Sequence, residues 1–172
     1  YQNEVIKTQT RRRGGMVERI RRGGFPAAVP YGWTAKYEED GTRRIEINEA
    51  QAAAVRLALV ELYLARGMGS VQICQELDRR GVPPPRGAAW ATSGIGSMLR
   101  LLPRYAGWTE LNRDSDQPYI KARGNWPPIL TDEEAEAVAA ERKARARARR
   151  SVESGYLLSR VVWCRACGRP MP

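Results

Sequence analysis

The chain has 172 residues, 29 lysines and arginines, 19 aspartates and glutamates, and no histidine, so its formal net charge is +10. The absence of histidine excludes Ser-His-Asp and Cys-His catalytic units and mixed cysteine–histidine zinc sites. Three cysteines can neither fill a four-cysteine zinc site nor make an even set of disulfides. No apolar run approaches the roughly 20 residues that span a bilayer, so we expect no membrane partner.

The positive charge is concentrated near the two ends. Residues 1–22 carry seven basic and two acidic side chains, and residues 142–150 carry six basic and none acidic, whereas residues 23–130 carry 13 basic and 11 acidic. A nearly neutral body between two cationic segments favours a polyanion, above all a nucleic acid, as partner. Solvated helix surfaces that only keep a protein soluble give the same pattern, and both interpretations stay open at this point.

The first 47 residues predict a helix followed by a hairpin. Residues 1–22 show a weak helical pattern, which Gly23-Gly24 ends. Residues 33–37 and 43–47 alternate between apolar and polar side chains on either side of Asp40-Gly41, a pattern typical of a β-hairpin.

A long apolar helix is expected next. Asn48 with Gln51 three residues later is typical of a capping box, and the helix that it opens stops at Gly67. This helix is apolar on two faces, which indicates a place in the middle of the core. Ser70 is expected to cap the following helix, and Gly81 to end it in the left-handed conformation.

Two short helices, 70–80 and 92–102, resemble a helix-turn-helix. The prolines at 83–85 make a stiff connector that is longer than the usual turn of three or four residues. Thr92 is expected to cap the second helix and Pro103 to end it. The polar face of that helix carries small side chains, which suits close approach to DNA. A helical core layer whose surface residues happen to be small is the alternative.

The last part of the body predicts a small sheet and a long basic helix. Residues 105–111 and 119–122 are expected to be strands. Residues 131–134 form a capping box for a helix that runs to about residue 150. The whole pattern predicts an α+β fold: a mainly helical domain with a small β-hairpin or sheet, a helix-turn-helix-like pair, and long basic helices at both ends.

The three cysteines divide into two kinds. Cys164 and Cys167 have the Cys-x-x-Cys-Gly spacing of the first knuckle of a zinc ribbon, and the two further ligands would follow residue 172. We therefore predict half a metal site and no bound cofactor in this chain. A redox pair has the same spacing but lacks βαβ surroundings here, and chance spacing is a third possibility. Cys74 lies on an apolar helical face and is expected to be a buried thiol.

No catalytic residue is predicted. No carboxylate pair stands in a known motif, no serine stands beside a base, and Gly94-Ile95-Gly96 lacks the third glycine and the preceding strand of a phosphate-binding loop.

Three segments, in this order, resemble the large serine recombinases, also called serine integrases. GGFPAAVPYGW at 23–33 is similar to the Gly-Gly-x-Pro-Pro-Tyr-Gly-Tyr entry into that family's recombinase domain. Residues 45–108 resemble the domain's centre, with its Gly-(Ile/Val)-Pro-(Thr/Pro)-Pro, Gly-x-x-Trp-(Ser/Thr) and Asn-Pro-x-Tyr-x-Gly motifs. YLLSRVVWCRACGRPM at 156–171 is similar to the start of the zinc-ribbon domain. The chain departs from the family at Leu102, where asparagine is usual, and at Cys74, where alanine is common.

The resemblance implies a parent protein that cuts and rejoins DNA at paired attachment sites through a phosphoserine linkage. Its catalytic serine would lie in an N-terminal resolvase-like domain that precedes this segment. Residues 1–22 would be the end of an interdomain helix, 23–150 the DNA-binding recombinase domain, and 151–172 the truncated start of the zinc-ribbon domain. The resemblance also implies zinc in the parent, assembly into dimers and tetramers, and a cytoplasmic protein encoded by a bacterium, a phage or another mobile element.

Double-stranded DNA is therefore the expected partner, with the basic linker in the minor groove and helix 92–102 facing the major groove. The predicted DNA contacts are Arg11, Arg12, Arg13, Arg21, Arg22, Arg86, Trp90, Thr92, Ser93, Ser97, Arg100 and Arg104. Two other functions stay open: a non-enzymatic helix-turn-helix regulator with a zinc appendage, and an RNA-binding protein that uses its arginine-rich arms.

Overall fold

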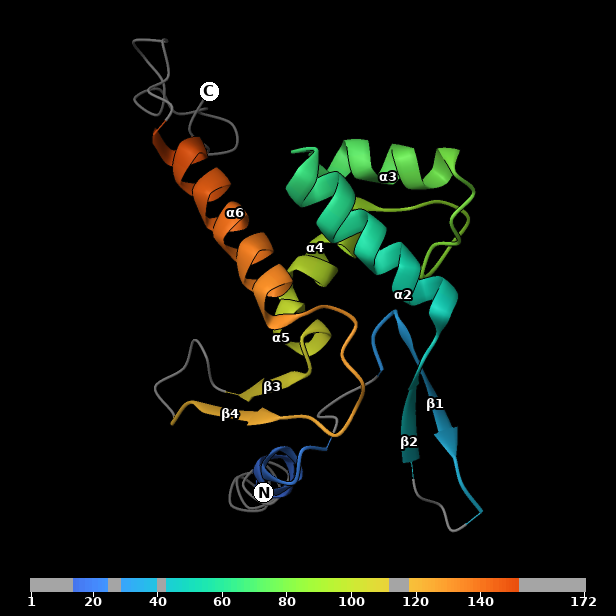
Figure 1. The fold of residues 1–172 in the computed structure, drawn as a ribbon, viewed down its shortest axis with the longest axis vertical. Coiled ribbons are helices and arrows are strands. Elements are labelled where there is room, and N and C mark those ends of the chain that lie inside the picture. The colour runs from blue at the N-terminus through green and yellow to red at the C-terminus, as the bar shows by residue number, and fades with distance from the viewer. Residues whose placement is uncertain (1–13, 25–28, 40–42, 112–117, 152–172) are drawn as a thin grey trace, which may run out of the picture. The chain divides into compact units, whose positions relative to one another are not determined.

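The computed structural model describes residues 14–24, 29–39, 43–111 and 118–151. The chain divides into two compact units, Tyr1–Ala139 and Ala140–Pro172, and each is described by itself. Helices and two small antiparallel sheets make up the described residues, so the predicted α+β class is confirmed (Figure 1). No helix in these ranges is long and apolar enough to cross a membrane.

The N-terminal helix is described over residues 14–21 and ends at a pair of glycines. The N–H of Gly23 donates to the carbonyl of Ile20 at 2.9 Å, and that of Gly24 donates to the carbonyl of Arg19 at 2.8 Å. With Gly23 at φ +72°, these two bonds make a Schellman cap, which is the break that the sequence predicts. The carbonyl of Gly23 also accepts the N–H of Asn125 at 2.9 Å, so the end of the helix is fastened to a distant part of the chain.

The predicted hairpin is confirmed. Strands β1 (Trp33–Tyr37) and β2 (Arg43–Ile47) pair antiparallel, while the expected turn at Asp40-Gly41 lies outside the described residues. Trp33 anchors the hairpin at one end, because it is only 4% exposed and its ring stacks on Tyr105 with the centroids 5.1 Å apart.

Helix α2 (Glu49–Arg56) continues directly into η1 (Leu57–Ala65), which has π-helical hydrogen bonding. Asn48 caps α2 by accepting the N–H of Gln51 at 3.1 Å. The other half of the predicted capping box is not formed, because Oε1 of Gln51 accepts the N–H of Gly32 at 3.0 Å instead. This bond satisfies the backbone N–H of the buried Gly32 at the entry to β1.

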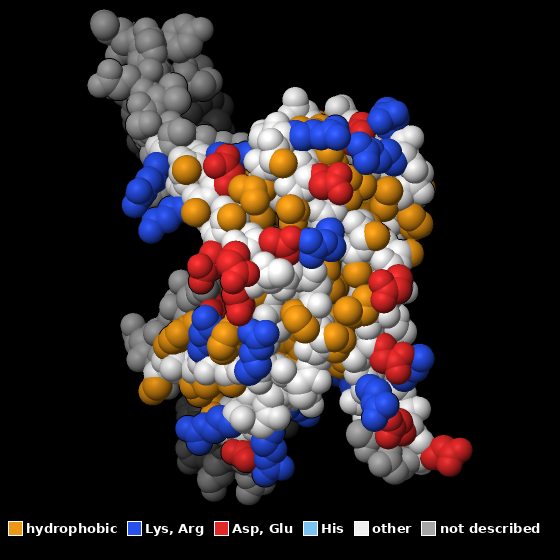
Figure 2. Space-filling view, in the orientation of Figure 1, with side chains coloured by type: hydrophobic (Ala, Val, Ile, Leu, Met, Phe, Trp, Pro, Cys, Tyr) orange, Lys and Arg blue, Asp and Glu red, His pale blue; other side chains and the backbone are white. Residues whose placement is uncertain are grey.

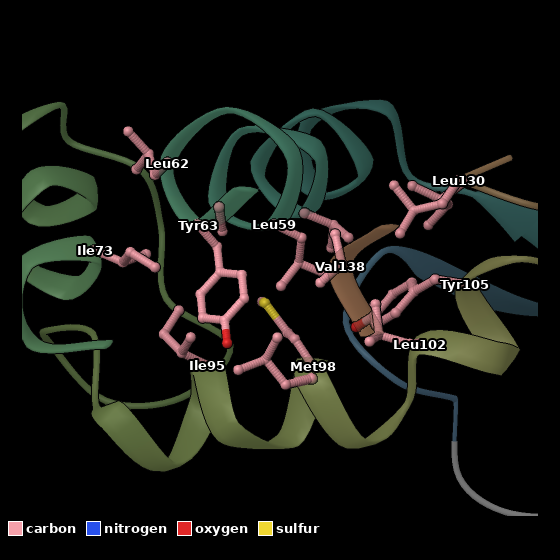
Figure 3. Packing of buried hydrophobic residues seen from close by; sticks show 14 of the residues in the cluster. Leu59, Leu62, Tyr63, Ile73, Ile95, Met98, Leu102, Tyr105, Leu130 and Val138 are labelled. Carbon is pink, nitrogen blue, oxygen red and sulfur yellow. The ribbon is translucent and has the colours of Figure 1, made fainter. Parts of the chain in front are cut away.

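The core lies where η1 faces α3 (Ser70–Arg79), α4 (Thr92–Arg100) and α5 (Leu102–Tyr105), and the first turns of α6 (Asp132–Ser151) close it (Figure 3). The prediction of a central apolar helix is thus confirmed. Side chains in this cluster with almost no exposed area are Val55, Ala58, Leu59, Leu62, Ile73, Leu77, Ile95, Tyr105 and Val138.

Two predicted helix caps are wrong. Gly69, not Ser70, is the N-cap of α3, because the side chain of Gln72 accepts the N–H of Gly69 at 2.9 Å and so starts the helix one residue earlier. Ala91 is the N-cap of α4, since its backbone already has the extended conformation (φ −108°, ψ 145°) that this position requires. Thr92 is therefore the first helical residue, and its exposed side chain caps nothing.

The segment after α4 also differs from the prediction. Helix α4 ends at Arg100, and Pro103 lies in the first turn of α5, where a proline needs no N–H partner. Helix α5 takes Tyr105 out of the predicted strand 105–111. Strand β3 is only Trp108–Leu111, and it pairs antiparallel with β4 (Ile120–Arg123).

Four tryptophans donate their indole N–H groups to other segments of the chain. Buried indole N–H groups need an acceptor inside the protein. The pairs are Trp33 with the carbonyl of Pro127 (2.9 Å), Trp90 with that of Val82 (2.7 Å), Trp126 with that of Arg104 (3.1 Å), and Trp108 with the carboxylate of Asp132 (2.7 Å). These bonds join segments that are distant in the sequence, such as β1 to the loop before α6 and β3 to the start of α6.

The predicted capping box at the start of α6 is confirmed in both halves. Thr131 accepts the N–H of Glu134 at 3.1 Å, and the carboxylate of Glu134 accepts the N–H of Thr131 at 2.9 Å. Arg56 donates to that carboxylate at 3.0 Å and to the carbonyl of Ile129 at 2.8 Å. Partial burial by itself raises the pKa of Glu134, but the hydrogen bonds from Arg56 and Thr131 outweigh it and lower the pKa below its ordinary value.

Candidate nucleic-acid interface

The connector between α3 and α4 is held at three points. Helix α3 ends at Gly81 in the predicted left-handed conformation (φ +67°). Beyond it, Trp90 donates its backbone N–H to the carboxylate of Asp78 at 2.9 Å and its indole N–H to the carbonyl of Val82 at 2.7 Å. The hydroxyl of Tyr31 donates to the carbonyl of Pro83 at 2.7 Å. The connector is therefore a fixed loop, although it is longer than the turn of a usual helix-turn-helix.

Trp90 belongs to this internal framework. Its side chain is 6% exposed, and the ring of Tyr31 meets it edge-on with the centroids 5.5 Å apart. The predicted contact between Trp90 and DNA thus falls on a side chain whose donor is already engaged inside the protein.

Four of the predicted contacts lie together on the outward side of α4. Its buried side faces the core through Ile95, Met98 and Leu99, and the opposite side carries Thr92, Ser93, Gly96, Ser97 and Arg100. We call these five residues the α4 outer face. Ser97 donates its hydroxyl to the carbonyl of Ser93 at 2.8 Å and accepts from the guanidinium of Arg100 at 2.9 Å. The α4 outer face therefore carries mostly short side chains, two of its residues are held by hydrogen bonds, and its positive charge lies at the C-terminal end of the helix.

Gly96 stands in the middle of the α4 outer face without a packing reason. A Cβ built on it would meet no atom within 4 Å. Glycine inside a helix costs about 0.5–1 kcal/mol relative to alanine, so this position gives up stability that the fold itself does not require.

A cleft of about 610 Å³ borders the α4 outer face. It brings together three of the predicted contacts: Arg86 from the connector and Ser93 and Ser97 from α4. Thr92 and Arg100 do not line it. The predicted contact Arg104 lies in α5, where it is half-buried, and burial lowers the pKa of its guanidinium.

The end of the N-terminal helix supplies a second group of predicted contacts. Arg21 and Arg22 are both exposed, and Arg22 pairs with Glu18 at 2.9 Å. The predicted contacts Arg11, Arg12 and Arg13 lie outside the described residues. On the face of the molecule in Figure 2, basic and acidic side chains alternate, in keeping with a body that is nearly neutral.

Two basic residues that lie close together, Lys121 and Arg123, are not among the predicted contacts. Lys121 and Arg123 on β4 lie over the ring of Trp108 on β3, at 4.4 Å and 4.8 Å from its centroid. Asp132 accepts from the indole of Trp108, and this bond, with the charges of Arg123 and Lys121, lowers the pKa of the Asp132 carboxyl. The signal was the alternation of 119–123, but only the register of the two strands places these cations over the tryptophan.

The described residues contain no cluster of three metal-ligating side chains. The predicted half site of Cys164 and Cys167 lies outside these residues. Cys74 is a buried free thiol, as predicted, and burial together with the charge of Asp78 raises its pKa.

The fold of this chain is similar to that of two solved structures. One similar solved structure is described as an LSR–DNA complex; it has a TM-score of 0.63 and 18% identity, and the match covers 86% of this chain and 42% of that chain. Another, from work on the sequence requirements of the Listeria innocua prophage attP site, has a TM-score of 0.61 and 19% identity, and the match covers 92% of this chain and 62% of that one. The chain thus spans less than two thirds of either structure.

No curated protein matches the chain. The profile of the Recombinase family matches residues 49–145, which contain α2, η1, α3, α4, both strands of the second sheet and most of α6. Because that match extends over more than half of the sequence, the protein belongs to the Recombinase family, as its resemblance to the large serine recombinases indicated.

Proposed function

We propose that this chain is a DNA-binding part of a site-specific serine recombinase and that it recognises attachment-site DNA. Membership of the Recombinase family supports this function, and so does the similarity of its fold to a structure described as a protein–DNA complex. The described residues contribute recognition in this proposal, and strand cleavage and exchange belong to the catalytic serine domain of the parent.

The observation that carries the proposal is the α4 outer face. A helix in the major groove contacts base edges through outward side chains that offer donors or acceptors, and short side chains also let its backbone come near the bases. Threonine and two serines supply short polar groups, the glycine leaves room for close approach, and the terminal arginine supplies a long donor. The hydrogen bonds of the connector hold α4 in one position on the core, which a helix that recognises bases needs.

The basic N-terminal helix would follow the same duplex. Arg21 and Arg22 are exposed and lie directly before a helix end that is fastened to the body through Gly23. Arginines at this place suit phosphates or a narrow minor groove. Arg104, which is half-buried, would contact DNA only through its exposed part.

We expect the 172-residue chain to bind duplex DNA with an affinity that falls steeply with salt. A log–log plot of the association constant against salt should have a slope of about −0.9 for each phosphate neutralised. Fluorescence anisotropy of a labelled duplex over a series of salt concentrations measures it. A flat salt response contradicts polyanion binding, and structured RNA that displaces the duplex at matched salt would favour the RNA-binding alternative.

Gly96→Ala should raise stability and lower DNA affinity together. The added methyl group meets nothing inside the protein, so helix propensity alone should raise the free energy of unfolding by about 0.5–1 kcal/mol. The same methyl group projects from the centre of the α4 outer face, where it would hold the helix away from the duplex. Thermal melting and duplex titration measure the two effects.

Gly15→Ala is the matched control for the gain in stability, because Gly15 is also helical and equally open. It should raise the free energy of unfolding by a similar amount. A Gly96→Ala variant that binds the duplex as tightly as the wild type would remove the α4 outer face from the interface.

Three properties of the parent remain part of the proposal. They are zinc binding that begins at Cys164 and Cys167, assembly into dimers and tetramers, and a bacterial or phage origin. A non-enzymatic helix-turn-helix regulator would use the same α4 outer face, and the reading frame upstream of Tyr1 distinguishes it from a recombinase. A resolvase-like domain with a nucleophilic serine supports the recombinase.

A further inference from the structure

The lining of the cleft beside α4 combines one cationic side chain with several apolar ones. Arg86 is the one charged side chain among the residues that line it, and no carboxylate does so. Pro85, Met98 and Leu101 provide apolar lining, which suits the carbon atoms of a sugar. A volume of about 610 Å³ is in the range of ligand-sized sites and admits a phosphodiester with its flanking sugars.

Arg86 is available for a ligand. Its side chain is exposed and makes no hydrogen bond or ion pair with any other residue in the described part of the chain. Several other arginines of the body are engaged by carboxylates: Arg44 by Glu38, Arg56 by Glu134, Arg79 and Arg80 by Glu76, and Arg123 by Asp132. The five donors of the guanidinium at the cleft are thus available to a ligand.

The loop that carries Arg86 is anchored by hydrogen bonds on both sides of that residue. Asp78 holds the backbone N–H of Trp90, and Tyr31 holds the carbonyl of Pro83, so the connector is fixed on both sides of Arg86. A loop that is ordered in advance loses little conformational entropy when it binds, and more of the contact energy then appears as affinity.

We infer that this cleft binds one phosphate of a duplex DNA backbone, with Arg86 as its ligand and Asp78 and Tyr31 as positioning residues. The hydroxyl of Ser93, which makes no hydrogen bond with the described residues, adds a donor in the same cleft. The inference rests on the proposed function, since it places the phosphate beside the α4 outer face. It goes further by assigning the connector, and not only the helix, to the interface.

Salt titration of three arginine variants tests the ligand. Arg86→Gln should lower the magnitude of the log–log salt slope by about 0.9, the amount expected for one phosphate, whereas Arg86→Lys should keep the wild-type slope. Arg66→Gln is the matched control, because Arg66 is equally exposed at the end of η1 and does not line the cleft. It should leave the slope unchanged.

Two Asp78 variants test the positioning role, because the role predicts that one of them strengthens DNA binding and the other weakens it. Removing a carboxylate from a DNA-binding protein should strengthen binding by charge alone. Asp78→Asn keeps an acceptor for the N–H of Trp90 and should bind at least as tightly as the wild type. Asp78→Ala removes the acceptor and should bind more weakly, at a temperature where circular dichroism shows both variants folded.

The outcomes separate this inference from the proposed function. If the wild type binds the duplex but Arg86→Gln keeps its slope, or Arg66→Gln loses as much, the phosphate site is wrong and the DNA-binding function stands. Equal tightening by both Asp78 variants would refute the positioning role. If the wild type binds no duplex DNA, the function and the site are both wrong.

Discussion

Tyr105→Ala is expected to lower the free energy of unfolding by about 3–5 kcal/mol, the range for losing a large buried aromatic side chain. Tyr105 is 1% exposed, and its ring stacks on Trp33. Its hydroxyl donates to the carbonyl of Tyr31 at 3.0 Å, and its backbone carbonyl accepts the N–H groups of Ile129 and Leu130. Removing the ring would leave a cavity where the hairpin, α5 and the loop before α6 meet. Urea unfolding followed by circular dichroism measures the loss.

Tyr105→Phe separates the ring from the hydroxyl. It keeps the stacking on Trp33 and loses one hydrogen bond, which should cost about 1–2 kcal/mol because the carbonyl of Tyr31 loses its donor. Burial, with a smaller contribution from Tyr31, raises the pKa of Tyr105 far above its ordinary value, so the hydroxyl stays a donor at neutral pH. Equal losses for the two variants would show that the ring contributes nothing beyond its hydroxyl.

Gly23→Ala should lower the free energy of unfolding by more than the backbone strain at this position alone. At φ +72° an alanine pays about 1–2 kcal/mol, and its Cβ would lie 2.9 Å from the carbonyl oxygen of Arg123. That oxygen belongs to the backbone of β4 and cannot rotate away, so the helix end must separate from the sheet. We expect a loss above 2 kcal/mol, together with weaker binding to duplex DNA, because Arg21 and Arg22 lose their fixed position.

Gly81→Ala is the matched control. Gly81 occupies the same position in a Schellman cap at φ +67°, but a Cβ there meets nothing within 4 Å. Its loss of stability should equal the backbone strain alone, about 1–2 kcal/mol. If the two alanine variants melted at the same temperature, the close approach between Gly23 and Arg123 would have no energetic weight.

Features that depend on neighbouring residues were predictable from the sequence. The alternation around the hairpin, the helix break at Gly23, the left-handed Gly81, and the capping box of Thr131 and Glu134 each depend on nearby residues. Local chemistry decides such features, although the N-caps predicted at Ser70 and Thr92 lie one residue too late in the chain. The α4 outer face follows in the same way from the spacing of its apolar residues.

Features that depend on distant partners were not predictable. Gln51 does not complete the predicted capping box, because its side-chain oxygen accepts the N–H of the buried Gly32 instead. Trp90 was predicted at the DNA surface, and only the folded chain shows that Val82 and Tyr31 enclose it. Lys121 and Arg123 join Trp108 through strand register, which a sequence of two short strands leaves open.

The indole hydrogen bonds give the protein a set of built-in optical probes. Trp33 and Trp126 report on the core near Tyr105, Trp108 on the second sheet, and Trp90 on the connector beside Arg86. Because each ring has its own acceptor in a different segment, local movement of the connector would change the surroundings of Trp90 and with them its fluorescence, which Trp90→Phe identifies by difference. DNA capture by the connector could then be timed separately from binding by the rest of the chain.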